Sequence, residues 1–401
     1  MSTPMVDPAS RNVMATDILF NIFSKFSFEQ KIKTAQVCQI WKDVVYHKTM
    51  WRNIKIQIDD YIEENNADTI LPNLVKRNIS SVMCSVASER DIEVLNKFMK
   101  EATNLKAIEF CTDKGRDEDL SDLIMFDMPN LIEVQIKGYR LLESVENCVA
   151  RCKNIQSLTL GLHYFGHIPM PNADSMMRNI ATKLEKLHSL RVHNFHRLTD
   201  VGIGHLSGCI ASATHSQLET LMLKMSNITD RGLQYIGSGF HSLTRLSLSS
   251  DNITNKGVGY IGNIKCLREL GLCSCDNVNR ECLKLLSNAG SRLSCLMIDS
   301  NRFDDKALEY IGESQLPLEE LDVSWWNITT EGLRHLVKHN QSIKHLRLNN
   351  CFYITDKSLE LIAEKFTSLR HLTVLCKNVT RHGIEKIRAS RRNVNVTSRY
   401  S

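Results

Sequence analysis

The chain has 401 residues, of which 42% are hydrophobic and 24% are charged, a composition typical of a globular protein with two or three domains. Its net charge of +5, from 50 basic and 45 acidic residues, is too small to argue for nucleic-acid binding. No apolar run approaches the roughly 18 residues that cross a membrane, and residues 1–12 lack the apolar segment of a signal peptide. We therefore expect a soluble protein of the cytoplasm, the nucleus or both, with no nucleic acid and no membrane as partner.

The thirteen cysteines are scattered along the chain and odd in number. In a chain without an export signal they are expected to be reduced thiols. Cys148 with Cys152 and Cys273 with Cys275 come nearest to metal-ligand spacing, but neither has a second pair at a fitting distance. We expect structural buried thiols, no metal and no cofactor.

After a disordered segment over residues 1–12, residues 13–53 predict a small all-α module of three short helices. The apolar residues at helical spacing in its first part are Ile18, Leu19, Ile22, Phe23 and Phe26. Cys38, Trp41 and Val45 share one face of its last helix, with Val37 and Val44 beside it. A core of about 40 residues rarely suffices alone, so we expect the surplus apolar surface to be covered by the first repeat on one side and by another protein on the other.

A repeat organises residues 79–393, after a linker or cap over 54–78 and before a cap strand and tail over 394–401. Segments such as "LETLMLKMSNITDRGLQYIG" (218–237) read apolar-x-x-apolar-x-apolar, then a polar gap, then Thr and a second apolar pattern. Most of the twelve unit starts are 24 to 26 residues apart, which is the leucine-rich-repeat period. The starts are Ile79, Leu105, Leu131, Ile155, Leu187, Leu218, Leu243, Leu267, Leu293, Leu318, Ile343 and Leu369.

One unit, residues 218–237, shows how each repeat folds. Leu221 and Leu223 face inward from a short strand, Thr229 stands where a helix start needs a side-chain acceptor, and Leu233 and Ile236 form one apolar stripe on a helix. A single unit cannot bury both faces, whereas a stack of units can. The sequence therefore predicts an α/β leucine-rich-repeat solenoid, with a parallel sheet on its concave face and helices on its convex face, preceded by the helical module.

Residues between the inward leucines are expected to point to the concave face. Trp and Arg are enriched among binding hot spots, so we take these residues as candidates for client contact, with Trp325 open between contact and packing and Trp326 expected to pack in its loop. The candidates are Arg191, His193, Met222, Lys224, Arg245, Asp322, Trp325, His345, Arg347 and Asn349. Extra residues at 166–175 and 211–217 are expected to form loops whose role is open.

The helical module resembles the F-box. The resemblance rests on Ile22-Phe23, Val37-Cys38, Trp41 and Trp51, while Val13-Met14 stands where that family has Leu-Pro. It implies that the module docks on the Skp-type adaptor of a cullin–RING ubiquitin ligase. The adaptor contacts it implies are Ile18, Leu19, Ile22, Phe23, Phe26, Val37, Cys38, Trp41 and Trp51.

Most of the chain is also similar to F-box and leucine-rich-repeat proteins of the partner-of-paired type, through segments such as "LTDVGIGHLSG" (198–208) and "ITDKSLELIAEKF" (354–366). That resemblance implies a non-catalytic receptor that holds a protein client, such as a transcription regulator, for ubiquitination and degradation, with cullin and RING subunits joined through the adaptor. One alternative is a repeat scaffold or inhibitor without a link to ubiquitination. A GTPase activator, with Arg191 or Arg245 as its arginine, is a weaker alternative.

Overall fold

The computed structural model describes residues 18–26, 28–47, 50, 55–57, 75–76, 79–86, 89–112, 127–138, 142–162, 172–210, 217–288, 292–314 and 316–400. The chain forms two compact units, residues 1–168 and 169–401. Within the described ranges, none of the helices combines the length and apolar composition of a membrane span.

The first unit begins with the three short helices expected from the sequence. They are residues 18–23, α2 (Phe28–Thr34) and α3 (Gln39–Val45). Among the described residues of this helical module, the buried apolar side chains are Phe23, Ala35, Val44, Val45 and Met50. This is a small core, so several other apolar side chains of the module cannot be inside it.

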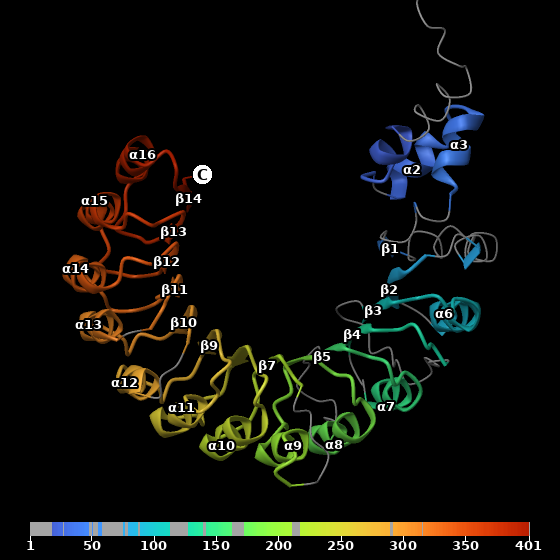
Figure 1. Ribbon diagram of the computed structural model, residues 1–401, viewed down its shortest axis with the longest axis horizontal. Coiled ribbons are helices and arrows are strands. Elements are labelled where there is room, and N and C mark those ends of the chain that lie inside the picture. Colours follow the sequence, from blue (N-terminus) through green and yellow to red (C-terminus); the bar gives the residue numbers. More distant parts are fainter. Residues whose placement is uncertain are drawn as a thin grey trace, which may run out of the picture. The chain divides into compact units, whose positions relative to one another are not determined.

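The first unit continues as a parallel sheet with helices on one side (Figure 1). Its strands are β1 (Lys55–Gln57), β2 (Ser81–Val86), β3 (Ala107–Thr112), β4 (Glu133–Gly138) and β5 (Ser157–Leu162), each paired in parallel with the next. Its helices are α6 (Glu89–Glu101) and α7 (Leu142–Arg151). Alternate strand residues, such as Val134 and Ile136 of β4, are buried against these helices.

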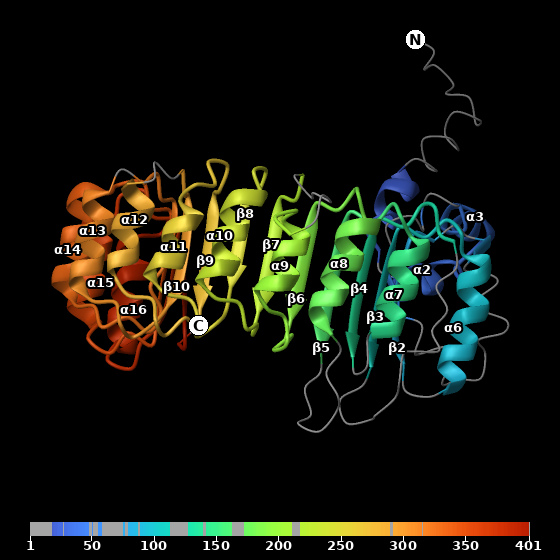
Figure 2. The ribbon, with the colours of Figure 1, turned by 90° about the horizontal axis from the view of Figure 1, so that it is seen from below.

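The second unit repeats the same strand–helix alternation. Its strands are β6 (Ser189–His193), β7 (Thr220–Lys224), β8 (Arg245–Leu248), β9 (Glu269–Cys273), β10 (Cys295–Asp299), β11 (Glu320–Asp322), β12 (His345–Asn349), β13 (His371–Leu375) and β14 (Asn395–Ser398), paired in parallel in this order. Its helices are α8 (Ala173–Lys183), α9 (Asp200–Leu206), α10 (Asp230–Gly239), α11 (Asn255–Ile261), α12 (Glu281–Asn288), α13 (Asp305–Glu313), α14 (Thr330–His339), α15 (Asp356–Lys365) and α16 (Arg381–Ser390). Within this unit the strands line the inner side of a curve and the helices its outer side (Figure 1, Figure 2).

The repeat frame read from the sequence is confirmed in both units. All twelve predicted unit starts, from Ile79 to Leu369, have exposed fractions of 2% or less, and each is followed two residues later by the first residue of a strand. The inward leucines of each strand stack on those of its neighbours, as Leu221 does on Leu190 and Leu246. The α/β leucine-rich-repeat solenoid with a helical module before it is therefore the fold of this chain.

Helix starts in the second unit are tied to one another by an aspartate–threonine ladder. The Asp in the first turn of one helix accepts hydrogen bonds from the backbone N–H and the hydroxyl of the Thr that caps the next helix, as Asp230 does from Thr254 at 2.8 and 2.6 Å. The pairs are Asp174–Thr199, Asp200–Thr229, Asp230–Thr254, Asp305–Thr329 and Asp356–Thr380. Hydrogen bonds to a charged acceptor contribute about 1.5–3 kcal/mol each. The ladder therefore stabilises the contact between successive repeats as well as the first turn of each helix.

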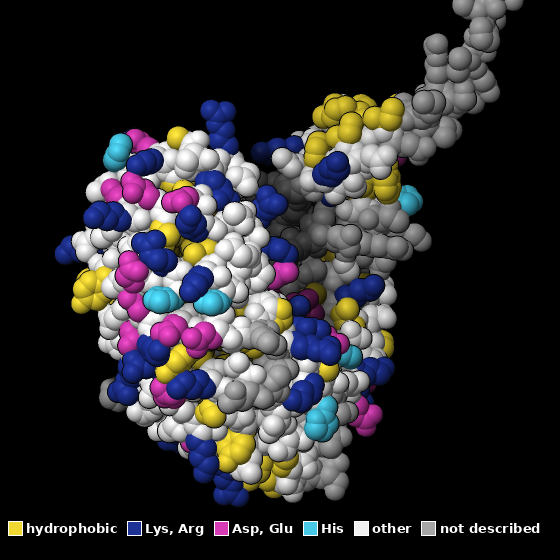
Figure 3. Space-filling model, turned by 60° about the vertical axis from the view of Figure 1, so that its left-hand side comes forward, with side chains coloured by type: hydrophobic (Ala, Val, Ile, Leu, Met, Phe, Trp, Pro, Cys, Tyr) yellow, Lys and Arg dark blue, Asp and Glu magenta, His cyan; other side chains and the backbone are white. Residues whose placement is uncertain are grey.

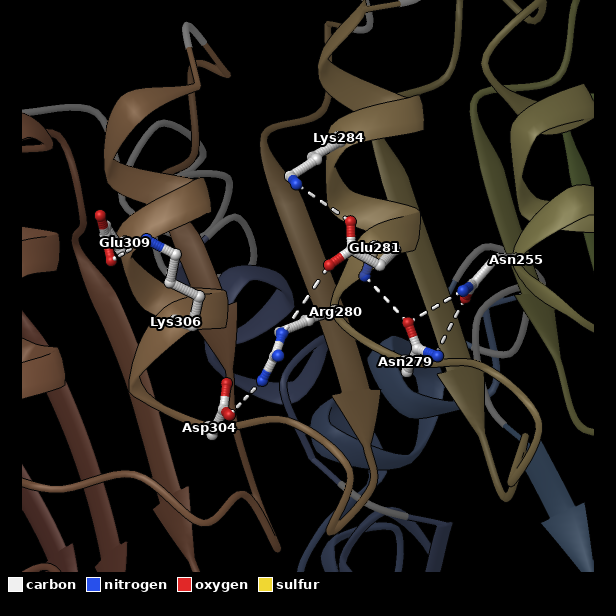
Figure 4. A network of polar contacts seen from close by, with 8 residues as sticks. All are labelled: Asn255, Asn279, Arg280, Glu281, Lys284, Asp304, Lys306 and Glu309. Atoms are coloured by element: carbon white, nitrogen blue, oxygen red, sulfur yellow. Dashed lines mark hydrogen bonds and ion pairs between the residues drawn. The ribbon is translucent and has the colours of Figure 1, made fainter.

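The same ladder explains why a glycine stands three residues after each of these five capping threonines. A Cβ on Gly257 would lie 2.3 Å from Asp230 Oδ1, and the equivalent distances at Gly202, Gly232, Gly332 and Gly383 are 2.2 to 2.6 Å. Where another residue replaces the aspartate, the glycine is absent. Figure 4 shows this part of the ladder: Asn255 bonds to Asn279, and Arg280 bonds to Asp304. Cys282 and Ala307 then stand at the glycine position.

One sequence expectation is wrong in detail. Residues 172–175 are not loop, because Asn172 accepts a hydrogen bond from Ser175 N at 3.2 Å and starts α8. The buried residue of the turn after β10 is Ser300, while Asn301, which follows it, is exposed. The turn after β10 is one residue shorter than the turn after β9. Phe303 follows Ile298 by five positions, whereas Val278 follows the equivalent Leu272 by six.

The predicted domain boundaries are not tested by these findings and stay predictions. The predicted disordered segment 1–12 and the loop residues 166–171 and 211–216 lie outside the described residues. Residue 217, the last residue of the second predicted loop, lies in a turn.

Candidate functional site

The first candidate site is an apolar surface on the helical module, here named the module surface. It consists of Ile18, Ile22, Val37, Ile40 and Tyr46, whose side chains are 55%, 46%, 61%, 58% and 36% exposed. Figure 3 shows hydrophobic side chains gathered on this part of the molecule. Single exposed apolar residues are ordinary, but five within about 30 residues form the kind of patch that marks a protein interaction site.

Aromatic packing beneath the module surface fixes its shape. Phe23 is 2% exposed and its ring lies 5.1 Å from that of Trp41, at 64°, and 5.3 Å from that of Phe26. Phe20 meets His47 edge-on at 5.8 Å. These contacts join the helix over 18–23 to α3, so the exposed residues of both helices are held in one arrangement.

Lys31 supports the turn between the first two helices from inside. Its side chain is fully buried, and Nζ donates hydrogen bonds to the carbonyl oxygens of Phe26, at 2.8 Å, and Ser24, at 3.4 Å. A cation beside the last carbonyls of a helix offsets the negative end of the helix dipole. Burial lowers the pKa of the Lys31 ammonium.

Eight of the nine predicted adaptor contacts lie within the described residues, and their burial divides them into three groups. Ile18, Ile22, Val37 and Cys38 are exposed, while Leu19, Phe26 and Trp41 are half-buried. Phe23 is 2% exposed and lies in the core of the module, beneath the module surface, and its adaptor contact stays a prediction. Trp51 lies outside the described residues.

Sequence reasoning missed Ile40 and Tyr46 as members of the module surface. Ile40 lies between Gln39 and Trp41 in α3, and the helical face assigned from the sequence ran through Cys38, Trp41 and Val45. Ile40 is 58% exposed, even though Val44, one turn further along α3, and Val45 are both buried. The presence of four apolar side chains in the seven residues of α3 was the signal that one face could not hold them all.

The second candidate site is the inner face of the second unit. The parallel register places Arg191, Met222 and Ser247 side by side on β6, β7 and β8, and places Met297, Asp322 and Arg347 side by side on β10, β11 and β12. These side chains alternate with buried leucines, so they are outside the core, as expected. Their role in client contact stays a prediction.

Several inner-face charges already have partners within this unit. Arg245 Nε lies 3.0 Å from Glu269 Oε1, and Arg191 Nη1 donates to Ser189 Oγ at 2.9 Å. The ring of His345 lies 4.5 Å from that of His371, and its Nδ1 is 3.7 Å from Glu320 Oε1. Exposed pairs of this kind contribute about 0.2–1 kcal/mol, so they organise the face more than they stabilise the fold.

The two adjacent tryptophans have opposite environments. Trp326 is fully buried, stacks on Phe303 at 4.6 Å and donates from Nε1 to the carbonyl oxygen of Ile298 at 2.6 Å, which confirms the expected loop packing. Trp325 is 53% exposed and has a φ of 68°. A bulky residue in the left-handed region is an outlier that costs about 1 kcal/mol or more.

Three more exposed apolar residues lie near Trp325 and were missed from the sequence. Phe352 and Tyr353 are 56% and 59% exposed in the turn after β12, and Leu375 is 41% exposed at the end of β13. Trp325 N donates to Asn349 O at 2.8 Å, and Asn350 N donates to Leu375 O at 3.2 Å, so the ends of β11, β12 and β13 are adjacent. The pair "FY" inside a polar turn was the available signal.

Comparison with known proteins finds a family match for one segment in each part of the chain. Residues 16–57 match an F-box-like family, and residues 339–363 match a leucine-rich-repeat family. Among solved structures, the crystal structure of the Rad7 and Elc1 complex in yeast contains a similar chain, with a TM-score of 0.54, 16% sequence identity and 98% of each chain covered. At that identity the likeness shows the fold alone. The narrower partner-of-paired subtype stays a prediction.

Proposed function

We propose that this chain, which carries an F-box-like segment and leucine-rich repeats, is the substrate receptor of a cullin–RING ubiquitin ligase of the Skp type. The observation that carries the proposal is the module surface, because its exposed apolar residues lie within the segment that matches the F-box-like family. An apolar surface of this kind is stable in water when a second protein covers it. The similar solved chain comes from a crystal structure of the Rad7 and Elc1 complex, which supports a search for a partner protein.

The proposed mechanism is positional, and the chain acts as a non-catalytic subunit. The module surface holds the adaptor, through it the cullin and the RING subunit, and the repeats hold a protein client such as a transcription regulator. Holding the client near the charged ubiquitin-conjugating enzyme raises the effective concentration of its lysines. We place the protein in the cytoplasm, the nucleus or both.

The test is co-purification with a Skp-type adaptor. Replacing Ile22 and Val37 together by Asp puts charge on two exposed positions, 46% and 61% accessible in the free chain. Because each side chain contributes about 2 kcal/mol when it is covered, the two together contribute about 4 kcal/mol, and we expect adaptor affinity to fall by about a thousandfold. The matched control is Val201→Asp, at a 49% exposed position in α9.

The expected result is full adaptor binding by the wild-type chain and the Val201→Asp control, and loss in the double variant with an unchanged circular dichroism spectrum. A wild-type chain that does not bind the adaptor would contradict the receptor function. The repeat scaffold without a link to ubiquitination would then be the better account.

A further inference from the structure

The ends of strands β11, β12 and β13 carry an exposed apolar group, here named the apolar edge: Trp325, Phe352, Tyr353 and Leu375. All four side chains are more than 40% exposed, and their backbone segments are joined by hydrogen bonds between adjacent repeats. Aromatic residues that are exposed in a free protein and rigidly held are typical anchors of binding sites.

Trp325 is held in its strained conformation by its neighbours. Asp322 Oδ1 accepts from the Ser324 N–H at 3.0 Å and from the Ser324 hydroxyl at 2.5 Å, which closes the turn at the end of β11. Trp326, buried behind it, fixes the other side of the turn. The other residues with positive φ at strand ends in the described part of the chain are Asn194, Met225, Ser274 and Asn350, so Trp325 is the one aromatic residue in this conformation. The indole of Trp325 is half-exposed in this conformation, and strained residues of this kind cluster at ligand-binding sites.

Carboxylates surround the strand ends on one side of Trp325. Asp299 ends β10, where its Oδ1 accepts from Ser274 N at 2.7 Å, and Asp276 lies in the turn after β9. Burial raises the pKa of the Asp299 carboxyl, and the nearby charges of Asp322 and Asp276 act in the same direction. A cation placed here would relieve the repulsion among these carboxylates.

On the other side of Trp325 the charges are positive. Arg347 lies beside Asp322 in the register of β11 and β12, and Lys377 follows β13. The surface therefore runs from acidic, through apolar, to basic along successive repeats, and this polarity decides the orientation and charge of a bound segment.

We propose that the apolar edge is the client-docking site and that its occupant is an extended segment of the client with a bulky apolar residue next to one or more Arg or Lys residues. The apolar residue packs against Trp325, Phe352, Tyr353 and Leu375, and the basic residue lies over Asp299, Asp322 and Asp276. This inference names the client chemistry of the receptor and so rests on the function proposed above.

The first experiment selects ligands without prior choice. A random peptide library displayed on phage is selected against the immobilised full-length chain in complex with the adaptor. The expected consensus holds Arg or Lys close to Trp, Phe or Leu. A consensus that lacks a basic residue, or no enrichment over the adaptor alone, overturns the proposal.

The second experiment measures one fluorescein-labelled consensus peptide by anisotropy on variants. Asn350 occupies the equivalent position of the next repeat with a φ of 56°, so Asn suits the positive φ of Trp325. We therefore expect Trp325→Asn to leave the thermal unfolding midpoint unchanged or to raise it. It should weaken the peptide by about tenfold or more. The matched control is Met225→Asn, since Met225 has a φ of 57° and is 48% exposed at the end of β7.

Two further variants keep the test decisive if Trp325→Asn lowers stability. Tyr353→Ser changes a turn side chain that is 59% exposed, and Asp299→Asn keeps the acceptor for Ser274 N while removing the charge. Both variants should bind the peptide with lower affinity. For Asp299→Asn, the affinity should also fall less when salt is added. Full affinity in both variants overturns the proposal.

Adaptor co-purification of the same samples separates this proposal from the receptor function. A Trp325→Asn chain that binds the adaptor but not the peptide supports both. A wild-type chain that binds the peptide but not the adaptor contradicts the receptor function and leaves the docking site standing.

Discussion

Single residues in this chain show which side chains serve the fold and which are left for partners. Trp325 and Trp326 are neighbours in sequence, yet only Trp326 has a stacking partner and an acceptor for its indole N–H. The sequence predicted packing for Trp326 and left Trp325 open, because the strand pattern stops at Asp322 and cannot say which indole the turn directs inward. Phe23 shows the same limit, since helical spacing groups it with Ile22 while the structure separates the two by burial.

Cysteine reactivity provides a prediction at the residue scale. The exposed thiols are Cys38, Cys209 and Cys266, while burial raises the pKa of Cys275 and of Cys295 to about 12. Because the thiolate is the nucleophile, we expect iodoacetamide at neutral pH to modify the three exposed cysteines first, as measured by peptide mass spectrometry. Rapid modification of Cys275 in the folded chain would contradict the assigned burial.

The buried Lys31 provides a second residue-scale prediction. Replacing it by Met keeps an unbranched side chain one atom shorter than Lys but leaves the carbonyl oxygens of Phe26 and Ser24 without this donor. We expect the Lys31→Met module to lose about 1–2 kcal/mol of stability and the chain to lose adaptor affinity as the turn loosens. Hydrogen exchange of residues 18–45 measures the first effect, and Lys33→Met, at an exposed position, is the control.

At the scale of elements, the repeat pattern predicted most of the structure because each apolar position has one place in the unit. The twelve starts define the strands, and the Thr caps define the helices. Lengths that vary between units could not be assigned in this way. The start of α8 depends on Asn172, a local cap within an irregular unit, and the shorter turn near Ser300 shifts its buried position by one residue.

The aspartate–threonine ladder predicts opposite effects for two glycines of α11. A methyl group on Gly257 would meet Asp230 Oδ1 at 2.3 Å, whereas on Gly259 its nearest neighbour is Leu285 Cδ1 at 3.5 Å. We expect Gly257→Ala to destabilise the second unit by about 1–3 kcal/mol and Gly259→Ala to stabilise it by about 0.5–1 kcal/mol through helix propensity. Urea unfolding measures both, and equal effects from the two substitutions would contradict the ladder.

At the scale of the whole molecule, two surfaces of different character serve one proposed task. The module surface, in the first unit, is apolar and matches an F-box-like segment, while the apolar edge, in the second unit, is flanked by charge of both signs. The sequence predicted the first through its surplus of apolar residues and through its resemblance to the F-box. It pointed to the second only through Trp325 and Asp322, because exposure in a turn leaves no periodic pattern.

The most direct test of the central claim measures whether an adaptor covers the module surface. Cys38 is exposed beside Val37, and Cys209 and Cys266 are exposed in the second unit as internal controls. We predict that a saturating Skp-type adaptor slows alkylation of Cys38 while the rates at Cys209 and Cys266 stay the same. Alkylation of Cys38 at an unchanged rate in the presence of the adaptor would contradict the account.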